Sequence, residues 1–423
     1  MKFRSLFLAS LAAMAFASCS NEEEATTAID GEVSQKEAIV QFGIAFAASE
    51  TRVATTGTDE KGVAAENTFV DATIVINQGI NKNVLTFAHS DFRQTSDETS
   101  PSILWLKEKI GVQAGAADVY VFLNASADLK ASLQSTAFTS YASLKETVDF
   151  STGIGALEGD GKIAESGKFL MCNESGTSTP ADPIFTVNEV NQLTVKVARV
   201  AAKLEEKTRG DNNFDVTNDL TNQAGKALKV QLTDFAYAGL QQDSWVLKNT
   251  NPIAANLYQP YGPRQAYAYQ PINGNQANYC MENLAITPTN WSTTTNIVYK
   301  GKITVDGEAV PNLYVTPDMK AFTSIADMEE AGIKYGGITE NSSIDDCLAV
   351  GLKKYENGIC YYVAKIETAN EGAIIKRNNI YRLSVNSIAN IGMPLPEDTP
   401  DPTLLSLTVE ITPWTVNLNS FDL

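Results

Sequence analysis

The chain has 423 residues, of which 43% are hydrophobic, so it is long enough for two or three domains with sizeable cores. Its 50 acidic residues outnumber the 32 Lys and Arg residues and give a formal net charge of −18. Nucleic acids and anionic lipid headgroups are recognised by clustered basic residues, so this balance argues against both as partners.

The N-terminus has the pattern of a bacterial lipoprotein signal. Lys2 and Arg4 precede a short apolar run, 6–17, which ends at Ser18 and Cys19. A charged start, a short apolar core and small residues before a cut describe a secretory signal, and the run is too short to span a bilayer as a helix. We therefore predict that residues 1–18 are a signal peptide and that Cys19 is lipidated. A cleaved signal without lipid is the alternative.

An acidic run, 20–24, follows Cys19 directly. It resembles the surface-export signal of Bacteroidetes lipoproteins, although short acidic blocks also serve as solvated tethers. Either interpretation places the rest of the chain outside the cytoplasm.

The first patterned segment predicts a β-strand with one apolar face, because apolar residues alternate with others along it. Its apolar residues are Val40, Phe42, Ile44 and Phe46. The stretch 47–57 that follows is small, polar and exposed in character, as proteolytic sites are. Arg52 is the only Arg between Arg4 and Arg93, so one cut before Val53 would release everything N-terminal to it. An ordinary surface loop is the alternative.

Alternating apolar runs between Gly, Asn, Asp and Thr clusters continue along the chain and predict an all-β, antiparallel protein. The clearest are 119–123, 193–200, 297–305, 359–366 and 380–388. Short helices are expected near 138–148 and 325–331. The polar segment 205–213 predicts a boundary between two β-domains, which we place at 53–210 and 211–392.

The C-terminus combines a proline-rich linker with one long strand. Four prolines fall within residues 393–403, and such a segment favours extended geometry outside a sheet. The segment 404–423 then alternates in two phases, with a kink or bulge expected at Pro413, where the phase changes. Its apolar residues are Leu405, Leu407, Val409, Ile411, Trp414, Val416 and Leu418.

No catalytic or metal-binding pattern stands out. The only histidine, His89, leaves no zinc-binding HExxH motif, and glycine-rich phosphate loops are absent from the sequence. We therefore expect no enzyme activity, cofactor or metal. Beyond Cys19 there are four cysteines, and Cys347 with Cys360 is the favoured disulfide, with free buried thiols as the alternative.

Several stretches resemble the fimbrilins of Bacteroidales, the structural subunits of major and minor fimbriae (pili). The resembling stretches are 195–203 (VKVARVAAK), 279–283 (YCMEN), 293–303 (TTTNIVYKGKI), 377–385 (RNNIYRLSV) and 409–416 (VEITPWTV). Each is weak alone, but their order, the lipoprotein signal and the proline-linked last strand together cover most of the chain.

The resemblance implies two transthyretin-like β-sandwich domains and delivery to the outer membrane surface as a palmitate-bearing lipoprotein. It also implies that an Arg-specific or trypsin-like protease removes the first strand, which favours a cut between Arg52 and Val53, with Lys36 and Lys61 as alternatives. Residues 19–52 would then be a propeptide, and 404–423 a donor strand that fills the vacated groove of another subunit.

The energetics are consistent with such donor-strand exchange. Burying the seven apolar residues of the last strand, at about 1.5 to 3 kcal/mol each, contributes on the order of 10 to 20 kcal/mol before entropy losses. Repeated head to tail, such a contact builds an open filament.

Two alternatives remain open. Within the family, the chain is a tip, accessory or anchor subunit, and host or bacterial surface receptors are possible partners. In another class, it is a surface glycan-binding lipoprotein of a polysaccharide-uptake system, with aromatic residues of the segment 258–279 offered to a sugar.

Overall fold

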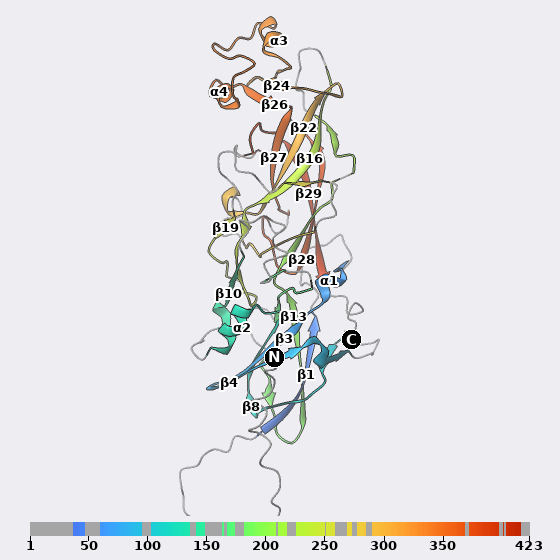
Figure 1. Cartoon of the computed structure of the whole chain (residues 1–423), viewed down its shortest axis with the longest axis vertical. Coiled ribbons are helices and arrows are strands. Elements are labelled where there is room, and N and C mark those ends of the chain that lie inside the picture. The colour runs from blue at the N-terminus through green and yellow to red at the C-terminus, as the bar shows by residue number, and fades with distance from the viewer. Residues whose placement is uncertain are drawn as a thin grey trace, which may run out of the picture. The chain divides into compact units, whose positions relative to one another are not determined.

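β-Strands dominate the chain, as the alternating pattern predicts (Figure 1). The computed structural model describes residues 37–46, 60–94, 103–135, 141–148, 163–164, 167–173, 182–208, 210–217, 226–249, 251–258, 269–272, 277–284, 290–368, 372–396, 401 and 403–415. All of these belong to one unit of mutually contacting residues, so the domain boundary at 210/211 stays a prediction.

The N-terminal sheet has nine strands and contains the first patterned segment as β1. Its members are β1 (Glu37–Phe46), β3 (Asp71–Gln78), β4 (Asn81–Ala88), β5 (Phe92–Gln94), β6 (Ile103–Leu106), β7 (Ile110–Gln113), β9 (Asp118–Leu123), β11 (Met171–Asn173) and β13 (Val190–Arg199). The order is β4-β3-β9-β11-β13-β1-β6-β5, and β7 also pairs with β1.

Two further sheets come from later parts of the chain. The β28 sheet has the order β2-β29-β28-β14-β21, from β2 (Glu60–Lys61), β14 (Ala202–Glu206), β21 (Asn278–Cys280), β28 (Asn379–Ile388) and β29 (Leu405–Thr415). The β22 sheet contains β15 (Asn213–Asp215), β16 (Leu228–Ala238), β20 (Gln270–Pro271), β22 (Asn296–Val305), β23 (Glu308–Ala309) and β27 (Ile359–Lys365).

Smaller elements complete the described fold. A three-stranded sheet joins β24 (Asn312–Val315), β25 (Ala321–Phe322) and β26 (Lys353–Glu356). Three two-stranded pairs join β8 (Gly115–Ala116) with β12 (Ile184–Phe185), β10 (Lys145–Thr147) with β18 (Asp243–Trp245), and β17 (Leu240–Gln241) with β19 (Leu257–Tyr258). The helices are α1 (Ala64–Asn67), α2 (Ala127–Gln134), α3 (Ile325–Glu330) and α4 (Ile344–Ala349).

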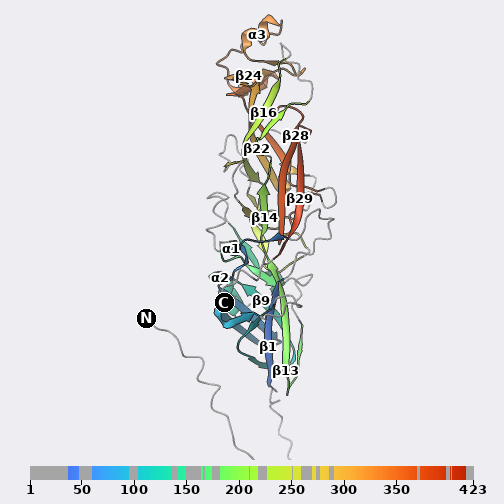
Figure 2. The ribbon, with the colours of Figure 1, turned by 90° about the vertical axis from the view of Figure 1, so that its right-hand side faces the viewer.

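Most strand pairs are antiparallel, as expected, but three are parallel: β1 with β13, β14 with β28, and β2 with β29. In each case the partners are far apart in sequence, so the connection is long enough to allow either direction. Figure 2 shows the longest antiparallel pair of the β28 sheet, β28 beside β29.

One of the two helix predictions is correct. The helix α3 begins after Ser324, whose hydroxyl accepts the Asp327 backbone N–H, and it buries Ile325 and Met328. The helix expected near 138–148 is wrong for the described part, which forms a 3-10 turn at Tyr141–Ser143 and then β10. Pairing with the distant β18 overrides the local helical spacing there.

Candidate functional site

The first strand occupies an interior position of the N-terminal sheet. On one side β1 runs parallel to β13, from Ile39 opposite Val190 to Phe46 opposite Val197. On its other side it pairs antiparallel with β6 and β7. Removing an interior strand would leave two unpaired backbone edges facing each other, and such edges recruit another strand.

The predicted apolar face of β1 points into the core. Val40, Phe42 and Ile44 have no exposed surface, and Phe46 is half-buried against the same core. At about 1.5 to 3 kcal/mol for each fully buried side chain, these three alone contribute roughly 5 to 9 kcal/mol. The strand is therefore a major part of this core.

The other face of β1 is closely covered at Gly43. A Cβ atom added there would lie 2.9 Å from Ile103 Cγ2 and 2.9 Å from two ring carbons of Trp105. Only glycine permits this approach, because ordinary carbon contacts are about 3.5 to 4.0 Å. A strand that replaced β1 with a larger residue at this position would have to displace Trp105.

The last strand is paired within its own chain. β29 runs antiparallel to β28, from Leu405 opposite Ile388 to Pro413 opposite Asn379. The bulge expected at Pro413 is wrong, because the register shift lies on β28 between Val385 and Ser387; a kink at Pro413 stays a prediction. Proline is tolerated because the N–H of the next residue, Trp414, donates to Asn378 O, so the nitrogen of Pro413 faces away from β28.

Burial along β29 is uneven. Ile411 and Trp414 are buried and Leu405 lies at the limit of burial, whereas Leu407 and Val409 are half-buried and pack against the core. Close to Trp414 both faces of the strand are covered, so the two apolar phases seen in the sequence are both satisfied there.

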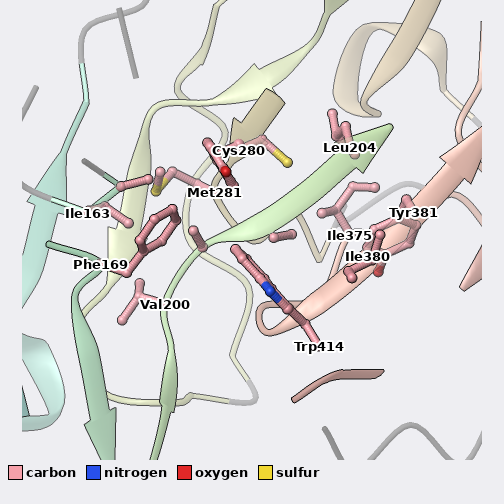
Figure 3. Packing of buried hydrophobic residues seen from close by; sticks show 14 of the residues in the cluster. Ile163, Phe169, Val200, Leu204, Cys280, Met281, Ile375, Ile380, Tyr381 and Trp414 are labelled. Atoms are coloured by element: carbon pink, nitrogen blue, oxygen red, sulfur yellow. The ribbon is translucent and has the colours of Figure 1, made fainter. Parts of the chain in front are cut away.

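Trp414 lies at the centre of a buried group of side chains that we call the Trp414 cluster: Glu66, Asn67, Phe169, Arg199, Lys203, Tyr279, Asn378 and Trp414. Figure 3 shows two of its members, Trp414 and Phe169, among neighbouring buried hydrophobic residues. The Tyr279 ring stacks on Trp414 with centroids 5.8 Å apart, and Phe169 meets it edge-on at 5.5 Å. Arg199 Cζ lies 4.2 Å from the centroid of the indole ring, a cation–π contact.

Arg199, fully buried, joins four parts of the chain. Its Nε donates to Glu66 O at 3.0 Å and its Nη2 donates to Asn67 Oδ1 at 2.5 Å. Its Nη1 donates to Asn378 Oδ1 at 3.3 Å and to Trp414 O at 2.9 Å. A buried charge is tolerated when its donors are satisfied in this way.

Glu66 supplies the negative charge of the cluster. Its Oε1 accepts the Tyr279 hydroxyl at 2.7 Å and lies 2.9 Å from Lys203 Nζ. Its Oε2 accepts the Val63 backbone N–H, which begins α1. Lys203 also pairs with Glu205 at 3.0 Å, so the charges alternate in sign across the cluster.

The pKa values in the cluster reflect this balance. Burial lowers the pKa of Arg199 to about 9, an effect that Glu66 partly offsets, so the guanidinium stays charged at neutral pH. Burial also acts to lower the pKa of Lys203, but the Glu66 and Glu205 carboxylates outweigh it and the pKa is raised. Arg199 and Lys203 therefore both stay charged, and their hydrogen bonds and ion pairs hold the neighbouring strands together.

The cluster connects the last strand to the part of the chain that follows the predicted cleavage position. β2 runs parallel to β29 with Glu60 opposite Trp414, and α1 follows with Glu66 and Asn67. The predicted residues Cys19, Arg52, Val53, Val416 and Leu418 lie outside the described residues.

The favoured disulfide is wrong. Cys172, Cys280, Cys347 and Cys360 are all free and buried. The sequence alternative of free thiols therefore holds: Cys360 belongs to the large hydrophobic core, whereas Cys347 belongs to a separate core with Tyr314 and Leu352. Burial raises the pKa of the Cys360 thiol to about 12, and it also raises the pKa values of Cys172 and Cys280, so these thiols are small apolar core residues.

The described ranges contain no group of three or more His, Cys, Asp or Glu side chains placed to hold a metal ion. They also contain no helix with the length and apolar character needed to cross a membrane. An open cleft of about 350 Å³ lies between β27 and the start of β29, lined by Trp291, Lys365, Glu367, Asp401 and Leu405 among others.

Sequence reasoning identified Trp414 but missed its partners. Arg199 and Lys203 lie in the stretch that carries the fimbrilin resemblance, and a charge inside the apolar run 195–202 was a usable signal for a buried ion pair. Glu66 and Asn67 gave no such signal, because a four-residue helix leaves no periodic pattern.

The class of protein follows from the fold: an all-β chain built from packed sheets. A crystal structure of a candidate cell adhesion protein from Parabacteroides distasonis shares this fold, with a TM-score of 0.50 and 14% identity over 90% of this chain and 98% of that one. A candidate cell adhesion protein from Bacteroides eggerthii aligns over 91% and 98% of the two chains with 12% identity and a TM-score of 0.47. The tip fimbrial protein Mfa3 from Porphyromonas gingivalis aligns over 89% and 100%, with 10% identity and a TM-score of 0.40.

The C-terminal region matches a particular protein family. Residues 353–420 match the family model of the major fimbrial subunit protein type IV, Fimbrillin, C-terminal. This segment contains β27, β28 and β29, so the fimbrilin resemblance is confirmed for the part of the chain that holds the last strand. No curated protein sequence matches the chain.

Proposed function

We propose that this protein is a structural subunit of a cell-surface fimbria. It is exported as a precursor lipidated at Cys19 and held at the outer membrane by that lipid, and a protease of Arg-specific or trypsin-like type cuts after Arg52. The subunits then polymerise by donor-strand exchange, with 404–423 of one copy filling the place of β1 in the next. The fimbrilin match of residues 353–420 supports the fimbrial assignment.

The single observation that carries this proposal is the interior position of β1. The strand lies between β13 on one side and β6 and β7 on the other, and it buries Val40, Phe42 and Ile44 completely. Its loss would expose a groove that an extended strand with alternating apolar residues fits, and the last strand has that pattern.

N-terminal sequencing of the protein recovered from the cell surface, with electron microscopy of the same sample, tests the proposal. Filaments whose subunits begin at Val53 are the expected result. Non-filamentous protein that begins at lipidated Cys19 would refute polymerisation and favour an anchor subunit. Subunits processed at Val53 but found only at filament ends would identify a tip or accessory subunit.

A second candidate function is glycan binding, favoured by the cleft beside Trp291. An indole ring with nearby Lys365, Glu367 and Asp401 offers a stacking face and hydrogen-bonding groups, the usual combination for a sugar. Trp291→Ala separates the two functions, because it should abolish glycan binding in the cleft and leave polymers unchanged. Deleting 404–423 should abolish polymers, but it also removes Leu405 from the lining of the cleft, so it does not test glycan binding.

A further inference from the structure

The proposed donor strand is engaged in its own chain before any exchange. β29 is hydrogen-bonded to β28 along its described length, and its other side pairs with β2 at Trp414 and Thr415. Donation to another copy therefore begins with separation of β29 from its own sheet.

The contacts are concentrated at the C-terminal end of β29. Leu407 and Val409 are half-buried, whereas Trp414 is fully buried and contacts two aromatic rings and a cation. Its backbone also participates, since Trp414 O accepts from Arg199 and Trp414 N–H donates to Asn378 O. Withdrawing this one residue breaks contacts with several segments at once.

Withdrawal of Trp414 also has an electrostatic cost. Arg199 would lose the indole face and one acceptor while remaining beside Glu66 and Asn67 in the protein interior. Breaking one partner away from a buried, hydrogen-bonded charge is strongly unfavourable because the charge is left incompletely compensated. The cluster therefore favours the docked state of β29.

Cleavage after Arg52 does not remove this obstacle. The N-terminal part of the chain contributes Glu66 and Asn67 to the cluster. It also contributes Gly62, whose backbone lies close to the Trp414 indole. All three are C-terminal to Arg52 and stay in the processed subunit. Proteolysis would thus open the β1 groove, while the last strand would stay paired with β28 of its own subunit.

We infer that the Trp414 cluster is a latch that keeps β29 docked in the processed subunit, and that strand exchange requires the latch to open. This inference rests on the proposed function. It adds a second step that controls polymerisation, after cleavage. Cleavage makes the acceptor groove available, and opening of the Trp414 cluster makes the donor strand available. A subunit after cleavage would then remain a monomer until the latch opens.

A reversible cross-link tests whether β29 leaves its sheet. Ser384 and Thr408 are directly opposed on β28 and β29, and neither is buried. Directly opposed residues have Cα atoms about 4.5 to 5.5 Å apart, within the range that disulfides accept. The double variant Ser384→Cys, Thr408→Cys should polymerise after processing when reduced and should not when oxidised. Polymers of the oxidised protein would overturn the inference, and each single variant is the control.

A second variant tests the latch itself. Trp414→Phe keeps an aromatic ring but loses part of the contact with Arg199 and Tyr279, so amide hydrogen exchange of β29 and the polymerisation rate after processing should both rise, on the order of tenfold. Phe322→Leu is the control for general destabilisation, because Phe322 belongs to a separate hydrophobic core with Tyr314, Met328 and Leu352. That variant should leave both rates near those of the wild type.

The outcomes separate the latch from the proposed function. Unchanged hydrogen exchange in β29 of Trp414→Phe would overturn the latch even if filaments form normally. If neither processed wild-type protein nor processed Trp414→Phe forms filaments, the proposed function fails, while the hydrogen-exchange comparison still decides whether the Trp414 cluster holds β29.

Discussion

The close approach at Gly62 provides a quantitative test of the Trp414 cluster. A Cβ atom at this position would lie 2.6 Å from Trp414 Nε1 and 2.7 Å from Glu66 Oε2. Both distances are about 1 Å short of ordinary contact. The indole cannot simply retreat, because Tyr279 and Phe169 pack against it.

Overpacking at Gly62→Ala should cost about 1 to 3 kcal/mol, the usual range for a well-packed site. The loss of backbone freedom in the unfolded chain works in the opposite direction by about 0.4 to 1 kcal/mol, so we expect the free energy of unfolding to fall by roughly 0 to 2.6 kcal/mol. Urea unfolding of the unprocessed chain, followed by tryptophan fluorescence, measures it.

Gly111→Ala is the matched control, since a Cβ atom at Gly111 would meet no atom within 4 Å and neither glycine has a positive φ. Its free energy of unfolding should change only by the small amount that comes from the reduced backbone freedom of the unfolded chain. Equal free-energy changes for Gly62→Ala and Gly111→Ala would refute the reasoning about the cluster.

Three further predictions concern the N-terminal sheet and the 3-10 turn that follows β4. Phe42→Ala should destabilise the precursor by about 3 to 5 kcal/mol in urea unfolding, and a loss below about 1 kcal/mol would mean that β1 is not part of this core. Gly43→Ala should speed dissociation of the cleaved N-terminal fragment, seen by size-exclusion chromatography, because its methyl group would meet Trp105; unchanged dissociation would contradict that contact. Burial, with help from Lys107, lowers the pKa of His89 below its usual 6.5, so the unfolded chain binds the proton more readily and stability should fall as the pH drops through 6.5. His89→Asn should lack this part of the pH dependence, which unfolding curves at pH 7.5 and 5.5 would show.

Strand positions were largely predictable from the sequence because alternation reports one buried face. Residues 359–366 and 380–388 correspond closely to β27 and β28, and the apolar face of β1 is buried as its pattern indicates. The register shift opposite Ser406 was not predictable, because a bulge on a partner strand leaves no mark in the strand that carries the proline.

The Trp414 cluster was less accessible to sequence reasoning. Its members come from around residues 66, 169, 199, 279, 378 and 414, and only the fold brings them together. A single buried arginine in an apolar run indicates that a partner exists without saying which carboxylate or carbonyl it is. Which residues meet, when they lie far apart in the sequence, is decided by the order and register of the strands and not by the local sequence pattern.

The sequence separation within the cluster also affects the order of folding. Arg199 finds two of its acceptors near residue 66, but the others are Asn378 and Trp414, close to the end of the chain. Because the chain is synthesised from its N-terminus, these high-contact-order bonds form last. A chain truncated before Trp414 would leave the Arg199 guanidinium without its final acceptor, so a complete set of bonds at Arg199 distinguishes full-length chains from truncated ones.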